Sequence, residues 1–249
     1  MKKNALFTGL VFLVGSVFGQ AVKAETLEDV KKKIHDKLAS YQSLHYKLKS
    51  VTDIKSPQMT MNMRSDTTFD CIRKGDKVLY RSEQKSKTDQ KIAGIEQKSD
   101  GYTLVIDDGA YVYSYSEQAG QKSASKEKSS PETQTNPFDA AKSFKSTEQM
   151  FNLKLLPDET INGQPTYVIE MTPKNAAMKA FSGKNVNYYD KKTGISVKSV
   201  SYDPKGKVVG TITTTDIKIN PKVDPSLFVF KAPQGVTVVD NTKAMQGNK

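Results

Sequence analysis

The chain has 249 residues, of which 36% are hydrophobic and 26% charged, and its formal net charge at pH 7 is +11. Its single cysteine excludes an internal disulfide, and the regular hydrophobic patterning described below excludes a disordered chain. The hydrophobic fraction is low for a thick double-layered core and favours one curved sheet with one apolar face, while the basic excess favours anionic lipid head groups or protein partners.

Residues 1–24 have the form of a cleaved secretory signal. Two lysines precede an apolar run from Ala5 to Gly19, and Val22 and Ala24 supply small residues for cleavage after Ala24. The run is shorter than the ~20 apolar residues that a transmembrane helix needs. Cleavage removes three lysines and no acidic residue, so the net charge falls from +11 to +8. We therefore expect an exported, periplasmic protein; a retained N-terminal anchor is the alternative.

The mature chain is predicted to open with an amphipathic helix. Apolar residues recur at steps of three and four, which places them on one stripe. The stripe consists of Leu27, Val30, Ile34, Leu38 and Tyr41. Thr26 stands in the N-cap position and Asp29 follows it three residues later, as in a capping box. Because the rest of the helix is charged, the stripe is expected to lie across an apolar surface.

After this helix the hydrophobic period changes to two, which predicts β-strands. Met59, Met61 and Met63 fall on one face of their strand. The stretch YTLVIDDGAYVYSY predicts a hairpin around Asp108-Gly109. The alternation predicts an antiparallel meander.

Residues 116–136 are rich in serine and lysine and lack apolar periodicity, so they are predicted to form a mobile polar loop. Short helices are expected after Pro137 and at 174–181, between further strands. The closing stretch VFKAPQGVTVVD predicts two short strands around a turn. In total, the sequence predicts ten or eleven strands and two or three short helices in one domain, residues 25–241. A polar tail, 242–249, follows this domain.

Candidate catalytic or metal-binding groups are scarce. The two histidines, His35 and His45, have no metal-ligand spacing, and no nucleophile or phosphate-binding motif accompanies them. Cys71 is predicted to be a small core residue. We therefore expect no enzyme activity, catalytic residue, metal or cofactor.

The make-up of the apolar faces points instead to binding. Methionine adapts to varied partners, and tyrosine combines an apolar ring with a polar group. One sheet with few covering helices leaves more apolar face than those helices can hide, and a sheet that curls into an incomplete barrel would hold this surplus as a lipid-binding groove. The alternative is that the same residues fill a core against the opening helix. The residues predicted to line the groove are Tyr46, Leu48, Met59, Met61, Met63, Phe69, Leu104, Ile106, Tyr111, Tyr113, Tyr167 and Ile169.

The end of the chain resembles the periplasmic outer-membrane lipoprotein carrier family of the LolA type. The family's C-terminal pattern, a Phe-x-Phe strand followed by Pro-x-Gly-Val, is matched by Phe228, Phe230, Pro233 and Gly235-Val236. The opening helix, the Asp-Gly hairpin, TNPFDAA and INGQPTYVIEMTPK recur in the family's order, so the resemblance covers essentially the whole mature chain.

The resemblance implies an α+β, mainly β fold: a single curved antiparallel sheet of about 11 strands, forming an unclosed half-barrel with helices over its concave face. It implies that Val78 and Tyr80 also line the groove. The family often has an Arg-Pro pair whose arginine holds the helical lid closed. Lys74 falls in the arginine's place and is the candidate latch, although a lysine cannot reproduce the planar donor fork. The neighbouring Arg73 is the alternative, but the alternation of a strand places it on the other face.

The functional hypothesis is a carrier that binds the acyl chains of lipoproteins, or a related amphipathic lipid, and shuttles them between membranes. The resemblance implies an inner-membrane releasing complex and an outer-membrane acceptor as partners; we expect a monomer and no nucleic acid. The alternative is a periplasmic sensor of lipids or lipoproteins that regulates an envelope-stress response. A sensor is expected to carry a second domain, and the chain ends soon after Asp240, which favours the carrier.

Overall fold

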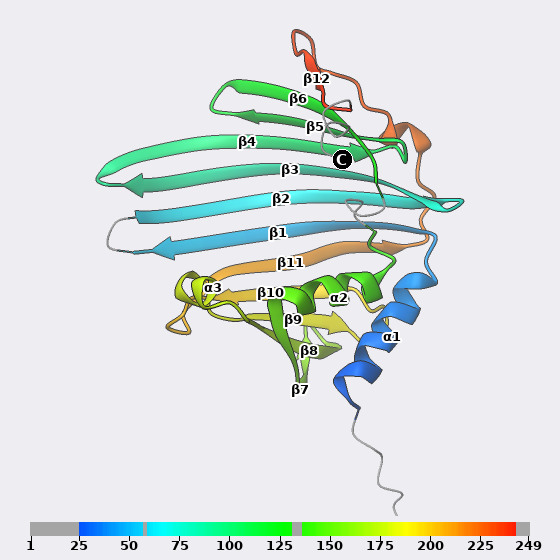
Figure 1. Ribbon diagram of the computed structural model, residues 1–249, viewed down its shortest axis with the longest axis vertical. Helices are drawn as coiled ribbons and strands as arrows, with labels where there is room; N and C mark the ends of the chain where they lie inside the picture. The colour runs from blue at the N-terminus through cyan, green and yellow to red at the C-terminus, as the bar shows by residue number, and fades with distance from the viewer. Residues whose placement is uncertain (1–24, 57–58, 131–135, 243–249) are drawn as a thin grey trace, which may run out of the picture.

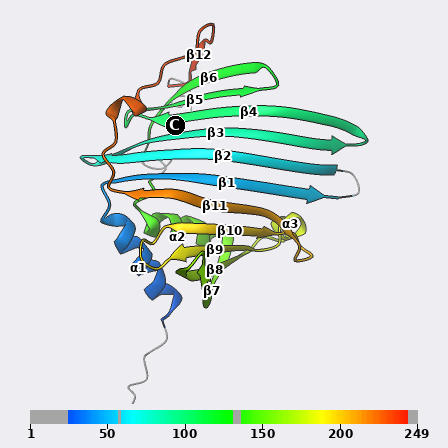
Figure 2. The same ribbon diagram turned by 180° about the vertical axis from the view of Figure 1, so that it is seen from behind.

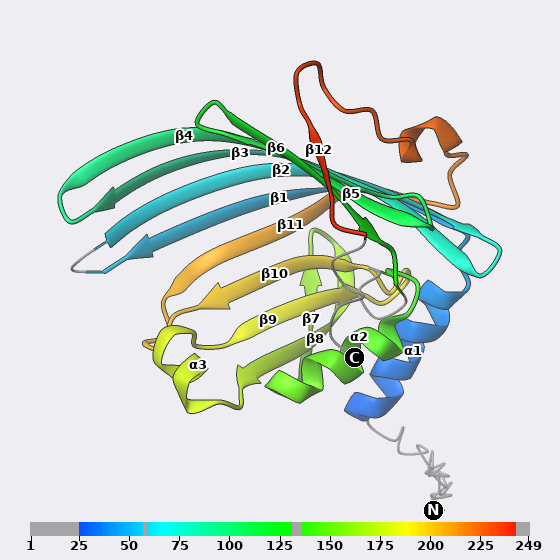
Figure 3. The same cartoon turned by 45° about the horizontal axis from the view of Figure 1, so that its top comes forward.

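The computed structural model describes residues 25–56, 59–130 and 136–242, so the predicted signal, 1–24, and most of the predicted tail lie outside the described residues. The described residues form one twelve-stranded sheet in the order β12-β6-β5-β4-β3-β2-β1-β11-β10-β9-β8-β7 (Figure 1). Every neighbouring pair is antiparallel except β12 with β6. The curved sheet does not close on itself, so the predicted unclosed half-barrel is confirmed, with one strand more than expected (Figure 3).

The strands divide into a long group and a short group. The long group and its neighbours are β1 (Ser43–Lys55), β2 (Met59–Lys74), β3 (Lys77–Ile92), β4 (Ile95–Asp107), β5 (Tyr111–Gln118) and β6 (Gln121–Lys128). The short group is β7 (Phe151–Ile161), β8 (Gln164–Pro173), β9 (Asn185–Asp190), β10 (Ser196–Tyr202) and β11 (Val208–Ile219). The last strand, β12 (Val238–Asp240), stands at the other edge of the sheet, beside β6. The helices are α1 (Leu27–Ala39), α2 (Ala140–Met150), α3 (Ala176–Phe181) and the 3-10 turn η1 (Pro225–Phe228). Within the described residues, no helix has both the length and the hydropathy that crossing a bilayer requires.

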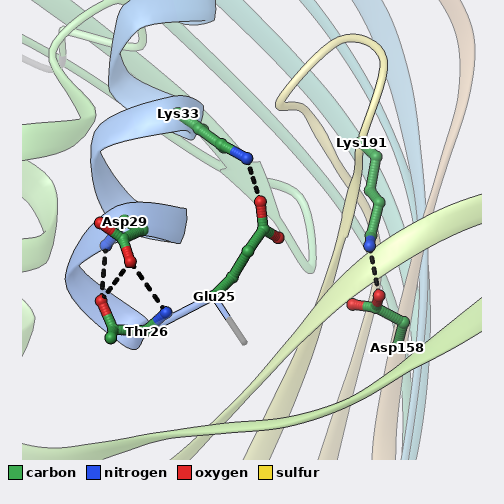
Figure 4. A network of polar contacts seen from close by, with 6 residues as sticks. All are labelled: Glu25, Thr26, Asp29, Lys33, Asp158 and Lys191. Atoms are coloured by element: carbon green, nitrogen blue, oxygen red, sulfur yellow. Dashed lines mark hydrogen bonds and ion pairs between the residues drawn. The ribbon is translucent and has the colours of Figure 1, made fainter. Parts of the chain in front are cut away.

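Helix α1 begins where the sequence predicts. The Thr26 hydroxyl accepts a hydrogen bond from the Asp29 backbone, and the Asp29 carboxylate accepts one from the Thr26 backbone, which completes the capping box. Lys33 pairs with Glu25 beside this cap, and Lys191, in the turn after β9, pairs with Asp158 of β7 (Figure 4). The buried stripe of the helix contains Val30 and Ile34, which are 0% and 1% exposed.

Helix α1 rests on the turn between β9 and β10. Gly194 in this turn has φ +74, and a Cβ there would stand 3.2 Å from the carbonyl oxygen of Ile34. The turn is therefore closed to larger residues for two reasons, its backbone conformation and the helix above it. The Tyr41 hydroxyl donates to the Thr193 carbonyl at 2.9 Å and holds the end of the helix in place.

The sheet has two faces, which we call inner and outer. The inner face carries α1 and α2, and its buried residues pack into two clusters under these helices. The outer face of the short group is filled by Val168, Val186, Tyr188, Val197 and Val200. The turn η1 lies beside the long group (Figure 2). Its Phe228 packs on the outer face of this group, against Leu79 and Ile106.

The closing stretch VFKAPQGVTVVD forms one short strand, where two were predicted. Residues 229–230 are not a strand; the Phe230 ring instead stacks on Tyr113, with 5.1 Å between ring centroids. A turn follows, and Val238–Asp240 then pairs in parallel with β6. The C-terminal segment therefore crosses the outer face and covers the free edge of β6.

The predicted loop 116–136 is wrong for most of its length. Residues 116–118 end β5, residues 121–128 form β6, and only 131–135 lie outside the described residues. Strand β6 shows no apolar alternation because only Ala124 is buried on it, at 4% exposure. Its backbone pairs with β5 on one side and β12 on the other, and these ladders form without apolar side chains.

Candidate lipid-binding groove

A groove lies between the two helices and the inner face of the sheet. It consists of two adjoining cavities of about 540 and 440 Å³ that share Leu38, Tyr46, Pro137, Ser143, Asn187 and Tyr189 as lining residues. The first cavity runs along α2, and the second continues over β1, β10 and β11. Their volumes are within the range of small-ligand sites in proteins.

Helix α2 forms the roof of the groove. Asp139 caps it by accepting from the Lys142 backbone at 3.0 Å, and Phe144 turns inward to lie 5.9 Å from the Tyr189 ring. Two contacts join α2 to α1: Lys31 pairs with Glu148 at 2.5 Å, and the Ala141 backbone donates to His35 Nδ1 at 3.3 Å. The two helices therefore form one cover.

The floor of the groove contains apolar residues, and its Tyr46 begins a row of aromatic rings that continues into the core. Tyr46, Phe69 and Tyr80 stack across β1, β2 and β3, with 4.8 and 6.1 Å between successive centroids. Leu44 and Leu48 flank this row on β1, and β10 and β11 add Ile195 and Ile212. Such a floor offers dispersion contacts to a hydrocarbon chain but no fixed charge.

The two tyrosines shared by the cavities stay neutral. Burial raises the pKa of Tyr189 to about 12, and burial also raises the pKa of Tyr46 far above its usual value. Charged groups reach the lining only through Asp139, Lys142 and Lys198. At neutral pH the charges of the lining are therefore confined to these three residues, and the two shared tyrosines add none.

The sheet separates the fourteen predicted groove residues by face. Tyr46 and Leu48 line the groove. Five others are buried on the same inner face, in the clusters under the helices: Phe69, Val78, Tyr80, Tyr167 and Ile169. The three methionines lie farther out along β2: Met63 and Met61 pair in register with Thr52 and Ile54 of β1, and Met59 pairs with Ile92 of β3. Met61 lines a separate cavity there.

Four predicted residues lie on the outer face and cannot reach the groove. Leu104 and Ile106 line a cavity of about 440 Å³ under residues 226–231. Tyr111 and Tyr113 stand beside Lys126 and Phe230 on this face. The reason is the register: Ile106 pairs with Arg81 and Tyr113 with Ile106, so all three share the face opposite to Tyr80.

Several groove residues were not predicted. Leu38, Met171, Tyr189 and Ile195 line the groove but are not among the residues that the sequence predicts to line it. The period of α1 and the alternation in VNYYD carry a signal for Leu38 and Tyr189. Phe144 has no such signal, because its position depends on how α2 lies across the sheet.

Arg73 takes the position that the sequence assigns to Lys74. Lys74 is exposed at the end of β2, whereas Arg73 donates to the carbonyls of Tyr41 at 2.9 Å and Ala39 at 3.3 Å. Its guanidinium also lies 4.4 Å from the centroid of Phe138, just before α2. Because Arg73 pairs with Val78 in the ladder, it points to the inner face. Arg73 thus holds the end of α1 and the start of α2 together.

Replacing Arg73 by glutamine should lower the free energy of unfolding by about 2 kcal/mol, since two hydrogen bonds from a charged donor and a ring contact are lost. Lys74→Gln is the matched control and should change it by less than about 0.5 kcal/mol. Urea denaturation measures both. Equal effects of the two substitutions would contradict the assignment to Arg73.

Cys71 is a core residue, as predicted. It is 0% exposed and packs in the cluster below Phe138. Burial raises the pKa of its thiol to about 12, so it stays protonated. Among the described residues, no group of three or more histidine, cysteine or acidic side chains is placed to hold a metal ion.

Comparison with solved structures finds similar chains at low identity, and one of them reaches a TM-score of 0.50. An uncharacterized conserved protein from Thermus thermophilus matches with a TM-score of 0.50 and 11% identity, over 87% of this chain and 99% of that one. MucB in the MucA/MucB complex of Pseudomonas aeruginosa matches with a TM-score of 0.45 and 15% identity, over 82% of this chain; the match spans only 60% of that chain. The Mycobacterium tuberculosis lipoprotein LppX matches with a TM-score of 0.37 and 13% identity, over 80% and 99% of the two chains.

Comparison at the level of sequence identifies a family. No curated protein matches the chain in sequence. A family model described as "Uncharacterized protein" matches residues 96–236, from the start of β4 to the turn before β12. Because this match covers more than half of the chain, the protein belongs to that family.

Proposed function

We propose that this protein is an exported, periplasmic carrier that binds the acyl chains of a lipoprotein, or of a related amphipathic lipid, in the groove under α1 and α2. The observation that carries the proposal is the pair of adjoining cavities between these helices and the apolar inner face. The resemblance of the sequence to the lipoprotein carrier family supports it, and so does the unclosed sheet.

The lining chemistry suits hydrocarbon better than a polar small molecule. Each methylene group that leaves water contributes about 0.8 kcal/mol. A chain partly covered by Leu44, Leu48 and Ile212 would thus be held tightly yet reversibly. The neutral Tyr46 and Tyr189 hydroxyls can donate to an ester carbonyl at the head of such a chain.

The role we propose is binding without catalysis. The charged groups of the lining have other contacts: Asp139 caps α2, and Lys198 lies 5.5 Å from the Tyr188 ring on the other face. Neither histidine lines the groove. Release would follow when a membrane receptor competes for the cover formed by α1 and α2.

Uptake of a fluorescent fatty acid tests the proposal. The purified protein should increase the probe's emission in a saturable way, and a lysophospholipid should displace it. Mass spectrometry of the untreated protein should find co-purified lipids or acylated peptides. A protein that is free of lipid as purified and also fails to take up the probe would contradict the carrier function.

A further inference from the structure

One end of the sheet carries the turns that lie farthest from α1. We call it the hairpin end and define it by residues 54–56, 59–60, 91–96, 174–184 and 203–208. The strand register places these segments at the same end of the sheet, spread from β8 to β4, since β1, β3, β8 and β10 run towards this end and β2, β4, β9 and β11 start from it. Figures 1 and 3 show the β3–β4 turn, α3 and the β10–β11 turn on the same side of the molecule.

The hairpin end exposes large apolar side chains. Ile92, Ile95, Phe181 and Val208 are 47%, 70%, 87% and 47% exposed. They are four of the eight large hydrophobic residues that are exposed in the described part of the chain. Single exposed apolar residues are ordinary, but a gathering on one end marks an interaction surface.

The β3–β4 turn contains more apolar residues than a turn exposed to water usually does. Ala93 and Gly94 form the turn with φ of 49 and 86°, and Ile92 pairs with Ile95 on the last rung of the ladder. Met59 stands opposite Ile92 on β2. A turn that only connects two strands in water is normally polar. Two isoleucines at the tip of a projecting hairpin therefore point to a partner outside the chain.

The charge of the hairpin end is strongly positive. Its segments contain seven lysines against two acidic residues, Glu96 and Asp203. The Asp203 carboxylate accepts hydrogen bonds from backbone amides of its own turn, those of Lys205 at 2.9 Å and Lys207 at 2.8 Å. Two of the lysines pair with acidic side chains, and a third donates to a backbone carbonyl of α2. The side chains of the other four form no ion pair with the residues that the structure describes: Lys55, Lys179, Lys205 and Lys207.

We propose that the hairpin end docks on a lipid membrane that contains anionic head groups. Exposed aliphatic and aromatic side chains enter the boundary between head groups and acyl chains, while surrounding lysines contact phosphate groups. The exposed apolar side chains suit the boundary between head groups and acyl chains, and the excess of lysine suits a negatively charged membrane surface. The proposal goes beyond the carrier function, because the hairpin end shares no residue with the groove.

The inner face connects the two sites without a fixed charge. Successive rungs across β1–β4 are Leu48–Thr67–Gln84–Thr103, Ser50–Ser65–Ser86–Gly101 and Thr52–Met63–Thr88–Ser99. The outer face at the same level alternates in sign, with Lys49, Asp66 and Lys85 on one rung. Docking at the hairpin end thus places an uncharged face between the membrane and the groove.

Vesicle co-sedimentation tests the apolar contribution. The purified protein should bind vesicles of phosphatidylcholine with about 30% phosphatidylglycerol and bind pure phosphatidylcholine far more weakly. Ile92→Ser with Ile95→Ser should reduce binding to the anionic vesicles roughly tenfold, because both side chains lose burial in the membrane.

Val229→Ser with Val239→Ser removes comparable exposed apolar surface elsewhere and should leave binding unchanged. Fatty-acid uptake in solution should be the same for both variants, which separates this test from that of the carrier function.

A charge-matched pair of variants tests the lysines. Lys179, Lys205 and Lys207 changed together to glutamine should lose about a hundredfold in binding at low salt, at ~1 kcal/mol for each lysine. Lys145, Lys154 and Lys222 changed to glutamine remove the same charge away from the hairpin end and should lose much less. Failure of the wild type to bind anionic vesicles, equal losses in the two triple variants, or full binding by the isoleucine variant would each overturn the proposal.

Discussion

Leu48→Glu should reduce acyl-probe uptake by at least a hundredfold while leaving the protein folded. Leu48 lines the second cavity on β1 and is only half-buried, so a carboxylate there stays hydrated in the free protein. A bound acyl chain would cover that carboxylate. The burial of an unpaired charge costs several kcal/mol, and binding would have to supply this free energy.

Titration with the fluorescent fatty acid measures this effect, and circular dichroism and urea denaturation check the fold. Leu48→Met keeps the volume and polarity of the site and should change affinity by less than about threefold. Val229→Glu places the same charge on an exposed position outside the groove and should have no effect on uptake. Normal uptake by Leu48→Glu would show that the acyl chain does not lie along β1.

Phe138→Ala should cost about 3–5 kcal/mol of unfolding free energy, the largest loss that we expect from one substitution. Phe138 is 0% exposed and packs among Leu44, Cys71 and Val78. Its ring also lies against the Arg73 guanidinium. Truncation leaves a cavity where the segment before α2 is anchored to the sheet, so the cover of the groove loosens as well.

Phe181→Ala is the matched control, since that ring is 87% exposed on α3, and its unfolding free energy should stay within about 0.5 kcal/mol of the wild type. Urea denaturation gives both values. A loss below about 1 kcal/mol for Phe138→Ala would mean that the segment before α2 is not anchored through this ring.

Much of the fold could be predicted because local patterns and tertiary packing agree. The stripe of α1, its capping box and the Asp108-Gly109 turn are each specified within a few residues, and all are present. Strand β6 could not be predicted in this way. Its pairing depends on the backbones of β5 and β12, and β12 lies far along the chain, beyond the whole short group of strands.

The site was harder to predict than the fold because alternation defines two faces without telling which one is inner. Tyr111 and Tyr113 were correctly placed on one face of their strand, but the register with β4 turns that face outward. Arg73 and Lys74 present the same difficulty, because neighbouring residues of a strand point to opposite faces and the sequence does not show which face meets the helix. Only the position of α1 relative to β2 shows which of the two side chains meets the helix.

The far part of the long strands is only one layer thick. Residues 91–98, which form the turn and the adjoining ends of β3 and β4, are all exposed, in contrast to the packed region below α1 and α2. A single pleated layer has no interlocked side chains that fix its curvature, so it can bend with its hydrogen-bond ladders intact. The protein thus combines a packed region around the groove with a single-layered extension of the sheet. We expect this extension to follow the slope of an uneven surface without a change in the volume of the groove.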